Sequence, residues 1–153
     1  MAIVNNAVIR RLSLLVIFVG TMSGCKEKFE SNYSSVAIAV KDGAFDRGWL
    51  PELLKPDVVN IREWHDIASN EIRGRFALNR RVLDSLQSTC KPAVDVPRKT
   101  WSMPEWFPES IPHGNAEAHG MRIFRCKNFF IAADAVAQAG YFWEADYPRS
   151  KKD

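Results

Sequence analysis

The sequence predicts an α+β fold: a mostly antiparallel sheet, one main helix packed on it, and a long loop rich in proline and tryptophan. The sheet follows from apolar and polar residues that alternate between Ile72 and Leu78, the period of a half-buried strand. The helix follows from the spacing of apolar residues within 80–90, before Pro92. The loop follows from five prolines between Lys91 and His113, with Trp101, Trp106 and Phe107 among them.

The first 24 residues have the pattern of a secretory signal. Arg10 and Arg11 precede the short apolar run 12–19, and small residues then lead to Cys25. The apolar run is too short to span about 30 Å of hydrocarbon. Met22-Ser23-Gly24-Cys25 resembles the lipobox of bacterial lipoproteins, which implies cleavage after residue 24 and acylation of the Cys25 thiol. The alternatives are an uncleaved membrane helix or an ordinary signal cut elsewhere.

The lipobox implies a protein anchored to the membrane through its N-terminal lipid. Two or more acyl chains hold a protein stably on a bilayer, whereas one holds it reversibly. Lys26 follows the cysteine, where aspartate commonly marks retention at the inner membrane. We therefore expect a lipid-anchored protein of the cell envelope, at the outer membrane and facing the periplasm.

The chain after the signal is nearly neutral and long enough for one domain. The signal holds two of the 21 basic side chains and none of the 18 acidic ones, which leaves 19 against 18. This balance argues against nucleic acid as a partner, because nucleic-acid binding needs a concentrated basic face. We expect a flexible tether over 25–35, one globular α+β domain over 36–147 and a frayed tail over 148–153.

Each predicted element rests on a local pattern. Asn79 is the expected N-cap of the main helix, whose apolar face is Val82, Leu83 and Leu86. The predicted strands are 36–40, a hairpin of 58–66 and 72–78, and three C-terminal strands over 121–126, 129–133 and 140–145. In the last strand, Phe142 must face one side while Tyr141 and Trp143 face the other. We expect the helix to cover one side and the proline-rich loop, with Trp101 and Trp106, to cover the other.

Cys90 and Cys126 are the two cysteines that remain after Cys25. An exported protein meets an oxidising compartment, where an even pair favours a disulfide. The alternatives are two separate buried thiols, or a metal pair completed by a histidine. We expect the Cys90–Cys126 disulfide.

Several segments together resemble a functionally uncharacterised set of small bacterial lipoproteins. The segments are Gly48-Trp49-Leu50-Pro51, residues 60–66 (NIREWHD) with Asn70-Glu71, Cys126, and Tyr141-Phe142-Trp143. The chain departs from that set at Ala68-Ser69 and at Gly74, where a bulky residue is more usual. The resemblance implies a lipoprotein with one compact domain and transfers no catalytic residue.

Glu63, His65 and Asp66 form the densest polar cluster. A functional interpretation makes His65 a general base oriented by a carboxylate. Strand alternation, however, places Asp66 on the face opposite His65, and no complete set of acid, base and nucleophile is present. We favour a hydrogen-bonded hairpin end in which Asp66 or Asn70 caps the turn.

Other candidate sites are weaker. His65, His113 and His119 match no strong zinc pattern, and we expect neither a metal site nor a cofactor. The five tryptophans could form a platform for a carbohydrate or peptide, although packing is their commoner use.

The sequence therefore predicts a non-enzymatic module that binds or shields another envelope component, such as an inhibitor or immunity protein. The alternative is a small envelope hydrolase that uses Glu63, His65 and Asp66. An exposed His65 beside Glu63 in a concave site would favour the hydrolase, and a buried cluster would favour binding or structure. The sequence leaves the partner and the oligomeric state open.

Overall fold

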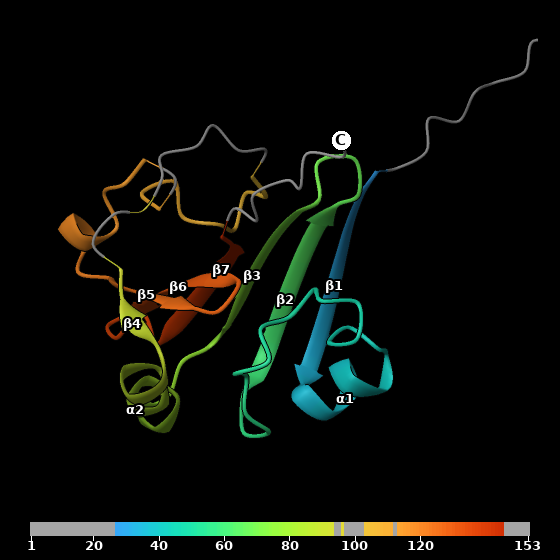
Figure 1. The fold of residues 1–153 in the computed structure, drawn as a ribbon, viewed down its shortest axis with the longest axis horizontal. Coiled ribbons are helices and arrows are strands. Elements are labelled where there is room, and N and C mark those ends of the chain that lie inside the picture. The colour runs from blue at the N-terminus through green and yellow to red at the C-terminus, as the bar shows by residue number, and fades with distance from the viewer. Residues whose placement is uncertain (1–26, 94–95, 97–102, 112, 146–153) are drawn as a thin grey trace, which may run out of the picture.

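A computed structural model of the chain describes residues 27–93, 96, 103–111 and 113–145. Seven antiparallel strands form one strongly twisted sheet in the order β1-β2-β3-β7-β6-β5-β4 (Figure 1). The strands are β1 (Lys28–Ser35), β2 (Val59–Asp66), β3 (Glu71–Ala77), β4 (Lys91–Pro92), β5 (Arg122–Cys126), β6 (Phe129–Asp134) and β7 (Ala139–Glu144). The helices are α1 (Val36–Lys41), α2 (Arg80–Thr89) and the 3₁₀ turn η1 (Glu117–His119).

The prediction of an α+β fold is wrong, because the structure is largely a β-sheet fold. Its helical content in the described part is one main helix and two short ones. The main helix α2 lies where the sequence placed it, and the Asn79 side chain accepts a hydrogen bond from the amide of Val82 at its start. The hairpin β2–β3 and the C-terminal strands β5, β6 and β7 also form as predicted.

Two local predictions at the N-terminal side are wrong. Lys28–Ser35, expected within a flexible tether, forms β1 and pairs along β2 from Lys28↔Asp66 to Ser35↔Val59. Val36–Lys41, expected as a strand, forms helix α1 because Ser35 serves as its N-cap. An edge strand gains its backbone hydrogen bonds from one neighbour, so β1 forms although Tyr33 is its one buried side chain.

Both faces of the sheet are covered. One face packs under α1, the segment 42–58 and α2, with Phe142, Ile61 and Leu86 in the same apolar core. The other face packs under the segment 103–121, where Phe107 and Ile111 join Tyr141 and Trp143 in a second core. The two faces of β7 are therefore covered as the sequence predicted, and Trp143 is 1% exposed. Phe107 contributes more to the second core than Trp106, which packs at its margin, and Trp101 lies outside the described residues.

The disulfide joins Cys90, at the end of α2, to Cys126, at the end of β5. The two Cα atoms are 4.8 Å apart, and both cysteines are buried in the first core. The bond holds α2 against the sheet at one end of its length. Within the described ranges, no helix has the length and apolar character needed to cross a bilayer.

Candidate functional site

A buried pair of polar side chains, Glu63 and His65, lies on β2 beneath the segment 42–58. Strand alternation puts both on the same face as Ile61. His65 Nδ1 lies 2.8 Å from Glu63 Oε1, within hydrogen-bond distance. Glu63 is 0% exposed and His65 is 5% exposed. Burial at this level is rare for a carboxylate unless it has a partner, and His65 is that partner.

A column of stacked side chains covers His65. Trp49 stacks on the imidazole with 3.9 Å between ring centres, and Phe29 stacks on it at 5.2 Å. The Arg47 guanidinium lies 3.9 Å from the centre of the Trp49 ring. Arg47 and His65 therefore occupy opposite faces of the indole, since two groups cannot share one face at that distance. The order of the column is Arg47, Trp49, His65 and Phe29.

The column is held in place from outside by Asp42. Arg47 donates a hydrogen bond of 2.7 Å to Asp42 Oδ2, and the Tyr33 hydroxyl donates one of 2.9 Å to the same oxygen. These two hydrogen bonds hold the pKa of Asp42 below its usual value. The segment that follows α1 is thereby tied to β1, with Trp49 over the polar pair.

Burial also controls the protonation of the pair. Desolvation raises the pKa of Glu63 to about 8, although the positive charge of Arg47 opposes this shift. Desolvation and then Arg47 lower the pKa of His65. Both shifts favour the uncharged form of the side chain. Glu63 Oε2 has no hydrogen-bond partner in the described part of the chain, which costs a neutral carboxyl less free energy than an ionised one.

Asp66 does not belong to this pair. Its Oδ1 accepts hydrogen bonds from the amides of Ala68, at 3.0 Å, and Ser69, at 3.4 Å, in the turn between β2 and β3. Asn70 completes the turn with a positive φ of 55°. The predicted cap by Asp66 is confirmed, and the structure separates Asp66 from His65 as alternation required.

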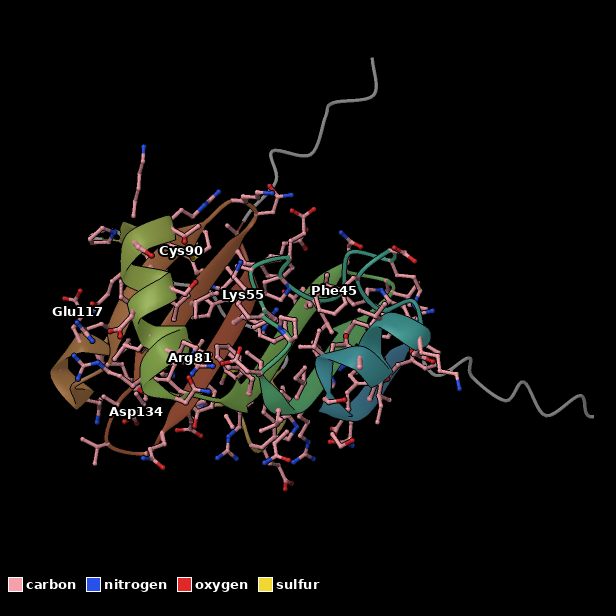
Figure 2. All side chains as sticks on the ribbon, turned by 90° about the horizontal axis from the view of Figure 1, so that it is seen from below. Phe45, Lys55, Arg81, Cys90, Glu117 and Asp134 are labelled. Atoms are coloured by element: carbon pink, nitrogen blue, oxygen red, sulfur yellow. A yellow bond between two sulfur atoms is a disulfide. The ribbon has the colours of Figure 1, made fainter. Side chains whose placement is uncertain are left out.

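A groove of about 670 Å³ opens beside the column. Figure 2 views this face: α2 with Cys90 lies on one side, the segment bearing Phe45 lies on the other, and Lys55 lies between them. Apolar walls come from Trp49, Leu53, Ile72 and Phe129, and charged groups at the rim come from Arg47, Glu52, Lys55, Lys127 and Glu144. Lys127 forms an ion pair with Glu52 across the rim.

The tryptophans of the described part are engaged in packing. Both faces of Trp49 are occupied by Arg47 and His65, and Trp143 stacks on Phe130 with 5.6 Å between ring centres. Trp64 is buried, and Trp106 donates a hydrogen bond to Glu30. These contacts argue against an open stacking platform at any of the four positions.

The remaining candidates lie apart from the site. His113 and His119 are exposed in the segment that covers the opposite face, and His65 is held by Glu63. Across the described ranges, no three His, Cys, Asp or Glu side chains come together as metal ligands. Cys25, the proposed acylation site, lies outside the described residues.

Strand alternation grouped Glu63 with His65, because they are two residues apart on one strand, and the structure confirms this. Alternation gave no signal for Phe29, which was assigned to the tether, or for the stacking of Trp49 and Arg47 on His65. These contacts depend on how β1 and the segment 42–58 pack, which no local pattern encodes.

A comparison with known families gave a match to part of the chain. A family model described as the YbbD head domain matches residues 27–77. The match spans β1 to β3, a third of the chain, and contains the whole column over His65. It suggests a bacterial envelope-associated protein. The comparison with curated proteins gave no match, and neither did the comparison with solved structures.

Proposed function

We propose that this chain is an envelope lipoprotein, anchored through lipid on Cys25, that binds another envelope component and catalyses no reaction. The outer membrane, facing the periplasm, is the proposed location, on the grounds of the lipobox and Lys26. The burial of the Glu63–His65 pair is the observation that supports a protein without catalytic activity. A general base must reach the proton that it takes, whereas His65 is only 5% exposed and lies against Trp49 and Phe29.

The groove beside Trp49 is the proposed binding surface. It combines apolar walls with charged groups of both signs at the rim, the composition expected where a protein or peptide segment docks. The Glu63–His65 pair lies behind Trp49 and supports that wall of the groove. In this proposal the pair has a structural role, and the groove has the binding role.

Photo-crosslinking in intact envelopes tests the binding role. A photo-crosslinking amino acid replaces Lys55 in the groove, and a matched control replaces Arg80, which is exposed on α2 outside the groove. We expect an adduct with one envelope component from position 55 and none from position 80. Equal adducts from both positions, or none from either, would contradict a docking role for the groove.

Two further measurements test the anchor and the absence of catalysis. The mature protein should have an acylated cysteine as its first residue by mass spectrometry, and the Cys25→Ser variant should leave the membrane fraction.

Glu63→Gln removes the ionisable carboxyl and keeps its shape, so it should retain capture of the partner. Loss of a measurable hydrolytic activity in Glu63→Gln envelopes would instead favour the hydrolase.

A further inference from the structure

The start of β1 lies very close to the proposed lipid anchor. The sheet begins at Lys28, three residues after Cys25, and three extended residues reach about 10 Å at most. The carbonyl of Glu27 already accepts a hydrogen bond from the amide of Ile67, at 2.8 Å. An anchored chain therefore has no long spacer between the acyl chains and the folded sheet.

The turn between β2 and β3 lies at the same end of the sheet as the start of β1. Lys28 pairs with Asp66, the last residue of β2, and Ile67 to Asn70 follow directly (Figure 1). Ile67 is 64% exposed at this turn, and Phe29, next to Lys28, is 43% exposed. Both large apolar side chains therefore lie at the end of the sheet that is nearest in the chain to the proposed acyl group.

We propose that this end of the sheet rests on the bilayer, with Ile67 in the interfacial region and Phe29 beside it. The inference rests on the proposed acylation of Cys25, because the short connection is what brings the turn to the lipid. Moving the Ile67 side chain out of water is favourable. Lys28 can keep its ammonium among the lipid headgroups while its aliphatic stem lies closer to the acyl chains. One such residue is too little to anchor a protein, but it is enough to orient one that a lipid already holds.

This orientation has a consequence for the groove. Asn70 and Ile72 belong to its lining and lie at or just after the turn. Glu144, another lining residue, is at the end of β7 that lies toward the turn, since Arg73 pairs with Trp143. The groove therefore opens beside the headgroups, where its partner would itself be at the membrane surface.

Val136 provides a matched control. It is a β-branched apolar residue, 96% exposed, in the turn between β6 and β7. Ala77 pairs with Ala139, so this turn lies at the opposite end of β3 and β7 from Ile67. The length of β3 separates the two turns by roughly 20 Å at about 3.4 Å per residue.

The experiment uses the acylated, full-length protein in intact envelopes. Ala68→p-benzoylphenylalanine places a photo-crosslinker next to Ile67, and Val136→p-benzoylphenylalanine places one at the far turn. We expect lipid adducts to be several-fold more abundant from position 68 than from position 136. Adding Ile67→Ser should reduce the adducts at position 68, whereas a polar change at the far turn, Val136→Ser, should not.

The mass of the N-terminal cysteine separates the two proposals. If Cys25 is acylated and positions 68 and 136 give equal lipid adducts, the orientation is wrong while the lipoprotein proposal stands. If Cys25 is not acylated, the anchor and the orientation both fail. If Val136→Ser reduced the lipid adducts at position 68 as much as Ile67→Ser does, this would also contradict the orientation.

Discussion

The ring of Phe142 on β7 lies over Gly74 on β3, in the space that a side chain at position 74 would fill. A Cβ built on Gly74 would be 1.8 Å from this ring, far inside van der Waals contact. Gly74 pairs with Phe142 on one side and with Glu63 on the other. The missing side chain therefore gives room to the core phenylalanine. Phe76 on β3 lies over Gly140 on β7 in the same way. Each of the two strands therefore has a glycine beneath a phenylalanine of the other.

Gly74→Ala should destabilise the fold by about 2–3 kcal/mol, because the buried Phe142 ring must move out of a packed core. Gly48→Ala is the control: a Cβ there meets nothing within 4 Å, but φ is 74°, so about 1 kcal/mol of backbone strain is expected. Urea unfolding of the three proteins gives both differences. A cost at Gly74 no larger than that at Gly48 would show that the Phe142 contact is not limiting.

Trp143→Ala should lower the free energy of unfolding by about 3–5 kcal/mol, the usual cost of truncating a core tryptophan. Trp143 stacks on Phe130 and meets the edge of Phe107, with centres 5.6 and 6.3 Å apart. Chemical denaturation measures the loss. Val136→Ala, at an exposed position, should change stability by less than about 0.5 kcal/mol. A small cost at Trp143 would contradict the packing of the segment 103–121 on this face.

Cys126→Ser should lower stability by roughly 2–5 kcal/mol, because it removes a bond that closes a long loop of the unfolded chain. Alkylation of the folded, exported protein without reduction should label neither Cys90 nor Cys126. Ser88→Ala, in the last turn of α2, is a control that leaves the bond intact. Two reactive thiols in the exported protein would show that the pair is not oxidised in its compartment.

The sequence predicted those elements whose burial repeats with the period of the backbone. Ile72, Phe76 and Leu78 are buried on one face of β3 and its continuation, and Val82 and Leu86 are buried on one face of α2. The strand β1 was missed because both of its faces are mostly exposed, so its side chains show no apolar alternation. The segment 36–41 was missed because valine and isoleucine favour strands, whereas the cap at Ser35 and the burial of Val36 and Ala39 favour one short helix.

Strand alternation also predicted part of the candidate site. Alternation on one strand placed Glu63 with His65 and separated Asp66, and the structure agrees on both points. Alternation does not account for Arg73, which is only 2% exposed, forms an ion pair with Glu71 and lies 5.7 Å from the centre of the Trp64 ring. Contacts between distant segments, such as Trp49 on His65, follow from tertiary packing and have no local signal.

The buried Glu63–His65 pair should make the stability of the protein depend on pH. Glu63→Gln should stabilise the protein between about pH 5 and pH 8. In the wild type, burial raises the pKa of Glu63 to about 8 in the folded state, while the unfolded carboxyl ionises near its model value of 4.5. The folded state thus holds a proton that the unfolded state releases, and stability falls as pH rises through this window, by up to about 1.4 kcal/mol per pH unit. Glutamine carries no such proton and can still contact His65 Nδ1.

His65 acts in the opposite direction at lower pH. Its pKa is lowered in the folded state, so the unfolded chain takes up a proton first and stability falls as pH drops below about 6.5. Urea unfolding of wild type and Glu63→Gln from pH 5 to pH 9 separates the two groups, because only the Glu63 contribution is removed by the change. We expect the difference between the proteins to grow from about pH 5 and to level off above pH 8. If Glu63→Gln is instead the less stable protein, and increasingly so toward pH 7, Glu63 is ionised and forms an ion pair with a protonated His65.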